Sequence, residues 1–336
     1  LQRHLGDGLV TVVGSGLSCA EGLPSMSALA AHLAAEIPKI VTGTDAALWT
    51  TLASEIAVSG LESALLKNPP SQSLEAAIVA CSADLIATAE RAVVAEIFGG
   101  KRTLRFTRLV KHLLKPSTGI PVVTTNYDRL IEIGVEEAGL GADTLFVGSF
   151  AGALNETESL LSFCREVRLQ RKMVRYRYQD RATVLKPHGS LDWYQRHGKP
   201  VRYAGDLDQP RLIITPGLNK FRNGYESPFD RHRERANQAI DRAARFLVIG
   251  YGFNDDHLET HLKPKITSGT PTLLLTSERS PNAIDLAQAH DNVIAIDRAV
   301  IGGKEGSRVF QHRLAHNIPD KNLWDLGSFI SEVLEP

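Results

Sequence analysis

Cysteine is scarce in this chain, and its few cysteines lie far apart. The 336 residues include three cysteines, Cys19, Cys81 and Cys164, and no C-x-x-C pair. Structural zinc sites need closely spaced thiolate ligands, so the sequence predicts no zinc site. An odd, sparse set of cysteines is typical of a reducing compartment, which predicts a cytoplasmic protein.

Charge of one sign and long hydrophobic runs are also lacking. Lys plus Arg and Asp plus Glu number 38 each, so the formal net charge is zero, and no overall basic field favours nucleic acid as a partner. The apolar runs are far shorter than the roughly 20 residues of a membrane span, so we expect no membrane partner. Hydrophobic residues make up 43% of the chain, which is enough for a sizeable core.

Short apolar segments alternate with helical patterns along much of the chain. Strand-like segments occur at 9–13, 122–125, 144–147, 182–186, 211–215, 245–250, 270–275 and 292–296, and we expect the last of these to be the final strand. Strands spaced by helices pair in parallel through crossover connections. The sequence therefore predicts an α/β fold with a Rossmann-like, doubly wound parallel sheet.

Residues 41–115 contain no strand-like segment. Apolar residues recur there at three- and four-residue spacing over 46–59, 73–98 and 103–114. We therefore predict an inserted helical subdomain at 41–115, a catalytic core at 1–40 and 116–300, and a C-terminal extension at 301–336 as a candidate interaction segment. The acidic side chains of the insertion are expected on solvated faces: Glu75, Asp84, Glu90 and Glu96.

Four predicted strands end in small or polar residues that suit ligand binding. These residues are Gly14-Ser-Gly16, then Asn126 with Asp128, then His188, and finally Gly250-Tyr-Gly252. The carboxyl ends of parallel strands meet at one edge of a sheet, so all four could face one crevice. Taken singly, the glycines also fit a plain tight turn, the Asn-Tyr-Asp sequence an Asx turn, and the histidine a structural role.

In this order, the motifs resemble those of the sirtuin family. The family's Gly-Ala-Gly-x-Ser and Gly-Ile-Pro element is similar to Gly14-Ser-Gly-Leu-Ser18 with Glu21-Gly-Leu-Pro24, and its Thr-Gln-Asn-Ile-Asp element is similar to Thr124-Thr-Asn-Tyr-Asp128. Its catalytic His-Gly is similar to His188-Gly189, and its later Gly-Thr-Ser region is similar to Val248-Ile-Gly-Tyr-Gly252. The resemblance covers roughly residues 8–298. The residues that make up these motifs are most similar to those of the bacterial sirtuin-like branch that is associated with antiphage defence and NAD depletion.

The chain also departs from protein-deacetylating sirtuins. It lacks their four-cysteine zinc module, and the helical insertion takes the place of their small domain. Ser25-Met26 stands where they carry Phe-Arg after Gly-Ile-Pro. The resemblance therefore implies cleavage of NAD as a substrate more than removal of acyl groups from lysine.

The resemblance also implies roles for individual residues. Asn126 would position the attacking water, His188 would act as general base, and Asp128 would bind the nicotinamide carboxamide. The other residues implied in NAD binding are Gly14, Ser15, Gly16, Ser18, Gly250, Tyr251 and Glu278. No metal ligand is implied.

These assignments lead to one favoured function and three alternatives. The favoured function is an NAD glycohydrolase that yields nicotinamide and ADP-ribose. The first alternative is an NAD- or ADP-ribose-binding regulatory subunit of a partner ATPase of the HerA type. Less favoured are a deacylase and a metal-dependent nuclease that would use Asp255, Asp256 and the basic segment 165–181. Adjacent carboxylates are more often a helix N-cap pair.

Control of the activity is expected, because a cytosolic NADase that is always active would kill its own cell. A homo-oligomer, a HerA-type ATPase or a phage-derived trigger could supply that control. The basic segment 165–181 is interpreted first as a solvated or subunit-facing surface. A nucleic-acid-contacting patch is the alternative.

Overall fold

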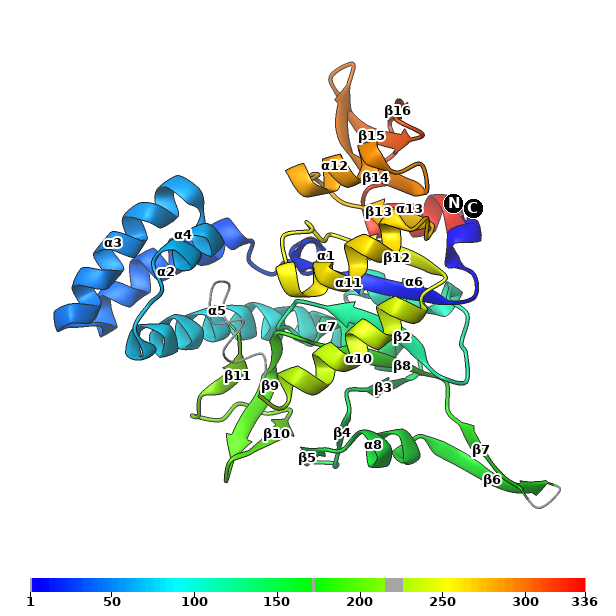
Figure 1. Cartoon of the computed structure of the whole chain (residues 1–336), viewed down its shortest axis with the longest axis horizontal. Helices are drawn as coiled ribbons and strands as arrows, with labels where there is room; N and C mark the ends of the chain where they lie inside the picture. The colour runs from blue at the N-terminus through cyan, green and yellow to red at the C-terminus, as the bar shows by residue number, and fades with distance from the viewer. Residues whose placement is uncertain (1, 171–172, 215–225, 336) are drawn as a thin grey trace.

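The computed structural model describes residues 2–170, 173–214 and 226–335 (Figure 1). Within these residues, nine strands form one sheet in the order β16-β15-β14-β13-β12-β1-β2-β8-β3. Their bounds are β1 (Leu9–Val13), β2 (Ile120–Thr124), β3 (Gly141–Asp143), β8 (Arg181–Leu185), β12 (Arg245–Ile249), β13 (Thr272–Leu275), β14 (Val293–Ile301), β15 (Lys304–Gln311) and β16 (Leu314–Pro319). The strands from β14 to β3 all pair in parallel.

Helices cover both faces of this sheet. One face packs against α6 (Arg105–His112), α7 (Leu130–Glu137) and α13 (Leu326–Phe329), and the other against α10 (Phe229–Arg242), α11 (Asp256–Thr267) and α12 (Pro281–Ala289). Side chains of a strand alternate between the faces, so Val13 joins the first core and Val12 the second. The predicted doubly wound α/β fold is confirmed.

The chain reverses direction across the sheet at β1. After β1, the strands β2, β3 and β8 form on one side of it, and the later strands β12, β13 and β14 form on the other side. A topological switch point therefore lies between β1 and β12, at the register where Val13 stands beside Ile249. The crevice beyond the carboxyl ends of such strands is the usual ligand site of open α/β sheets.

A helical layer extends from one end of the molecule toward the main sheet in Figure 1. It follows the short α1 (Ser15–Ala20) and consists of α2 (Met26–Ile40), α3 (Gly43–Ser59), α4 (Leu61–Lys67) and α5 (Gln72–Phe98). These helices share a core of their own that includes Leu33, Trp49, Leu52 and Ile78. The seven-residue α4 was not predicted from the sequence, because it is too short for a periodic pattern. The limits of the subdomain stay a prediction.

A smaller antiparallel sheet lies beside the main one, in the order β11-β9-β10-β5-β4. It comprises β4 (Phe146–Val147), β5 (Ala151–Leu154), β9 (Gly189–Arg196), β10 (Lys199–Tyr203) and β11 (Arg211–Ile213). The prediction that 144–147 and 211–215 are strands of the parallel sheet is therefore wrong. Short apolar runs fit either sheet, and the hairpin turn at His197 and Gly198, both at positive φ, directs β9 and β10 into antiparallel pairing.

The C-terminal residues extend the main sheet. β15 pairs antiparallel with β14, and β16 with β15. The prediction that 292–296 is the final strand is wrong, because the charged residues of β15 hide its strand pattern. The interaction role suggested for 301–336 stays a prediction. No helix of the described residues is long and apolar enough to span a bilayer.

A two-stranded antiparallel hairpin projects from the body of the molecule (Figure 1). It follows α8 (Glu156–Ser162) and consists of β6 (Cys164–Gln170) and β7 (Met173–Tyr178). This hairpin accounts for most of the segment whose pattern looks irregular and basic in the sequence.

Candidate functional site

A pocket of about 270 Å³ lies at the carboxyl ends of β1, β2, β8 and β12. Among the described residues that line it are eight of the ten predicted site residues: Gly14, Ser15, Ser18, Asn126, Asp128, His188, Gly250 and Tyr251. The two that do not line it are Gly16 and Glu278. Glu278 is exposed after β13, and its carbonyl accepts a hydrogen bond of 2.7 Å from the Thr276 hydroxyl.

The turns after β1 and β12 touch through their backbones. A Cβ on Gly14 would lie 2.4 Å from the Gly250 carbonyl oxygen, and one on Gly16 would lie 2.7 Å from the Gly250 Cα. The N–H of Gly14 donates to the Ile249 carbonyl at 2.9 Å, and that of Gly16 to the Gly250 carbonyl at 3.0 Å. These glycines therefore join the two turns, and their N–H groups are used within the protein. Phosphate binding by the Gly14–Gly16 turn stays a prediction.

Asn126 belongs to a buried chain of hydrogen bonds. Its Nδ2 donates to the Gly14 carbonyl at 2.9 Å and to Ser18 Oγ at 2.8 Å, and Ser18 Oγ donates to Asp128 Oδ2 at 2.6 Å. The Gly14 carbonyl only accepts, so the NH₂ end of the amide must face it. Both amide hydrogens are thus used within the protein, which leaves Asn126 Oδ1 as the atom that can accept a hydrogen bond from a ligand or water.

Asp128 is buried, and the backbone around it is held by a buried lysine. Burial raises the pKa of Asp128, while Lys186 and the Ser18 hydrogen bond act in the opposite direction. Lys186 is 1% exposed, donates to the Asp128 carbonyl and lies 3.0 Å from Glu132 Oε1. Sequence reasoning did not assign Lys186 or Glu132 to the site.

His188 contacts a carboxylate that was not predicted as its partner. His188 Nε2 lies 2.7 Å from Asp255 Oδ2, and both side chains are less than 10% exposed. The other oxygen, Asp255 Oδ1, accepts from the N–H groups of His257 and Leu258 and so caps α11. The N-cap interpretation of Asp255 is confirmed, and the cap fixes the carboxylate that lies beside the imidazole.

The loop that carries Asp255 is fastened by the next helix. Ser280 donates to the Gly252 carbonyl, and Asn282 Nδ2 donates to the Phe253 carbonyl at 2.6 Å. Phe253 is fully buried with a φ of 55°, a conformation that costs about 1 kcal/mol or more outside glycine. The first turn of α12 therefore holds the Tyr251–Asp255 loop in place.

A family profile described as a SIR2-like domain matches residues 121–293, which include Asn126, His188 and Asp255. The chain belongs to the SIR2-like domain family. The sirtuin resemblance of the sequence is thereby confirmed at the level of the family, and the antiphage branch stays a prediction. No curated protein matches this SIR2-like chain at a significant level.

Solved structures that are similar to this chain include several Sir2 proteins. A study of the mechanism and regulation of Sir2 enzymes supplies one at 14% identity and a TM-score of 0.39, covering 85% of each chain. A Sir2 homologue variant in complex with ADP-ribose has 13% identity and a TM-score of 0.39, covering 84% of this chain and 86% of its own. A Sir2–p53 peptide–NAD+ structure has 15% identity and a TM-score of 0.35, covering 82% and 83%.

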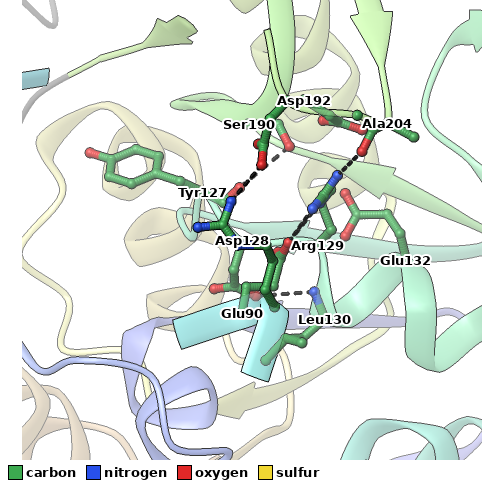
Figure 2. Close-up of polar contacts among 12 residues, drawn as sticks. Glu90, Tyr127, Asp128, Arg129, Leu130, Glu132, Ser190, Asp192 and Ala204 are labelled. Atoms are coloured by element: carbon green, nitrogen blue, oxygen red, sulfur yellow. Dashed lines mark hydrogen bonds and ion pairs between the residues drawn. The ribbon is translucent and has the colours of Figure 1, made fainter. Parts of the chain in front are cut away.

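Buried charges connect the SIR2-like site to the helical layer (Figure 2). Glu90 of α5 is fully buried and accepts from Arg129 Nε at 2.8 Å, and Arg129 Nη1 donates to the Ala204 carbonyl at 2.6 Å. The expectation that Glu90 lies on a solvated face is wrong. It falls in the apolar series with Ala87 and Val93 at three-residue spacing, which is a signal the sequence does offer.

No metal centre is seen among the described residues, where no three His, Cys, Asp or Glu side chains are grouped to hold an ion. The side chain of Asp256, which the nuclease alternative needs, lies outside the described residues. Asp255 is engaged with His188 and the α11 N-terminus. The geometry therefore gives the nuclease alternative no specific support.

Acid is expected to destabilise the fold through His232. Burial, together with nearby Lys186, lowers the pKa of His232 to about 3, and its Nδ1 accepts from the Lys186 N–H at 3.1 Å. Below the unfolded pKa of about 6.5 only the unfolded chain gains the proton, so stability falls as the pH drops toward 3. At pH 4.5 the loss is about 2–3 kcal/mol relative to neutral pH.

Urea unfolding at pH 7 and pH 4.5 measures this loss. In His232→Asn, whose Oδ1 can accept in place of Nδ1, the difference in the free energy of unfolding between the two pH values should shrink by about 2–3 kcal/mol. His197→Asn is the matched control, because His197 is exposed. Equal pH dependence in His232→Asn and the unmodified chain would contradict the assignment.

Proposed function

We propose that this SIR2-like protein is an NAD glycohydrolase that releases nicotinamide and ADP-ribose. The observation that carries the proposal is the convergence of Asn126, Asp128 and His188 on one pocket with the joined turns of Gly14 and Gly250. That pocket opens at the switch point of a parallel sheet, where open α/β folds bind nucleotides. Membership of the SIR2-like family supports NAD as the nucleotide.

The proposed chemistry is hydrolysis of the bond between nicotinamide and ribose. Asn126 Oδ1 accepts a hydrogen bond from water and holds it near the anomeric carbon, while His188 removes the water proton. The water oxygen bonds to that carbon as the carbon–nitrogen bond breaks, and the bonding electron pair leaves with nicotinamide. Asp255 orients the imidazole and stabilises its positive charge, and Asp128 binds the carboxamide.

Hydrolysis is favoured over acyl transfer by the residues that line the pocket. Ser25 and Met26 border it at the position where the sequence departs from the deacetylase pattern. Glu62 of α4 and Ile86 of α5 border it as well, so the helical insertion forms one wall. We propose that this wall leaves the anomeric carbon to water instead of an acyl-lysine peptide.

Asn126→Ala is expected to lower nicotinamide release by at least about 10²-fold, because the water loses its anchor and the Gly14–Ser18 network loses its link. The measurement is chromatographic separation of nicotinamide and ADP-ribose after incubation with NAD. Asn317→Ala, an exposed change on β16, is the control and should keep full activity. Nicotinamide release that requires an acetyl-lysine peptide would indicate deacylation, and binding of NAD without turnover would indicate a regulatory module.

We further propose that the activity serves antiphage defence by depleting NAD in the bacterial cytoplasm. This part rests on the motif resemblance alone, and it includes activation by a phage-derived trigger or a HerA-type ATPase. Phage plating on cells that express the chain or its Asn126→Ala variant tests it. Equal plaque numbers with both would remove the proposed role while leaving the enzymatic proposal untouched.

A further inference from the structure

The projecting hairpin β6–β7 has two chemically different faces. Residues directly opposite each other on paired strands lie on the same face. The pairs Val167 with Tyr176 and Leu169 with Val174 therefore share one face, and the pairs Glu166 with Arg177 and Arg168 with Arg175 share the other. One face is thus apolar and the other is basic.

The apolar face is exposed to solvent. The exposed fractions are 62% for Val167, 76% for Leu169, 54% for Val174 and 50% for Tyr176. A two-stranded hairpin alone is only marginally stable in water, and contiguous exposed apolar side chains usually mark an interface. Figure 1 shows β6 and β7 extending away from both sheets, so the described part of the same chain does not cover this face.

We propose that the apolar face of the hairpin packs against the same face of a second copy of this chain, in a twofold contact. The four side chains of this face are uncharged, so two copies meet without repulsion between them, and their arginine faces point outward into solvent. A twofold contact is self-complementary and is the commonest way for a protein to form a dimer. The inference is independent of the proposed enzymatic activity.

Nucleic acid is the less favoured occupant, because it would need the basic face. Arg168 Nε lies 2.7 Å from Glu166 Oε1, and Arg177 Nη1 lies 4.0 Å from Glu166 Oε2. The carboxylate thus offsets part of the positive charge that a phosphate backbone would require. Binding of nucleic acid to the basic face would also leave the four apolar side chains in water, so it does not explain the amphipathic pattern.

The size of the apolar face sets the strength of the contact. Four side chains that each bury about 100 Å² give roughly 400 Å² per chain, half of the ~800 Å² per partner of a standard interface. Further contact is available just before the hairpin, where Leu161 of α8 is 45% exposed. We therefore expect a dimer that dissociates at micromolar concentration.

Sedimentation velocity of the full chain between 1 and 100 µM tests the proposal. The unmodified chain should shift from monomer to dimer over this range, and Leu169→Glu should weaken association by at least tenfold. Arg175→Gln changes the opposite face of the same hairpin and should leave association unchanged. A chain that stays monomeric at 100 µM, or a dimer that Leu169→Glu does not weaken, overturns the proposal.

Amide hydrogen exchange provides a second measurement that needs no substitution. Exchange in β6 and β7 should slow when the concentration rises from 1 to 100 µM, because the contact protects the hairpin. A dimer without slower exchange there places the interface elsewhere and overturns the proposal. Binding of a 20-base-pair DNA duplex that Arg175→Gln abolishes, by a chain that stays monomeric, would assign the hairpin to nucleic acid instead.

Discussion

Replacement of His188 by alanine is expected to reduce the proposed NAD cleavage by roughly 10²–10⁴-fold, the usual contribution of a positioned general base. The imidazole faces the pocket from the end of β8 and is held by Asp255 at 2.7 Å. The measurement is kcat/KM for nicotinamide release by purified protein. His316→Ala, an exposed change on β16, should keep full activity. Full activity in His188→Ala would remove this histidine from the mechanism.

Asp255→Asn separates the charge of the carboxylate from its capping role. Asparagine is as good an N-cap as aspartate, so α11 should keep its first turn and the stability should change little. The rate should still fall, by less than in His188→Ala, because the imidazolium loses its counter-charge. A normal rate with Asp255→Asn would show that the contact with His188 is structural.

Removal of the Glu90 carboxylate is expected to destabilise the protein by about 3–5 kcal/mol, because Glu90→Ala leaves a largely buried arginine uncompensated. Arg129 is bound through its N–H groups to Glu90 and to the Ala204 carbonyl, so α5, the β2–α7 turn and the segment after β10 all meet at this guanidinium. The measurement is the free energy of unfolding in urea at neutral pH.

Glu96→Ala supplies the matched control on the same helix. Glu96 Oε2 lies 3.3 Å from Arg102 Nε, but its side chain is 52% exposed. An exposed ion pair contributes about 1 kcal/mol or less, so this variant should stay close to the unmodified chain. Similar losses in both variants would mean that the Glu90 pair is not the junction between these three segments.

The strand ends could be predicted because their signals are local. The run of apolar residues before Gly250, or before Asn126, predicts a buried strand, and the residue after it must lie at the sheet edge. That reasoning brings eight of the ten predicted residues to one pocket. It is also why the main sheet could be predicted while β4 and β11, equally short and apolar, were assigned to the wrong sheet.

The contacts between distant segments could not be predicted in the same way. Asp255 and His188 follow strands that are neither sequential nor neighbours in the sheet, so their meeting depends on strand order and on the bend at Phe253. Glu90 and Arg129 meet only because α5 returns to the turn after β2. The available signal was a carboxylate within an apolar helical series. It predicts that Glu90 has a buried partner of opposite charge, but it does not indicate which residue that partner is.

The joined turns of Gly14, Gly16 and Gly250 also determine how a ligand reaches the pocket. Because backbone touches backbone there, the crevice cannot widen by parting β1 from β12. Another part of its wall is made by side chains of the helical layer, including Met26, Glu62 and Ile86. The helices α2 to α4 share a core with part of α5, and α5 also packs against Leu130 and Leu191 beside the sheet. A wider entrance to the crevice would therefore have to come from movement of that wall, on the side formed by α2 and α4.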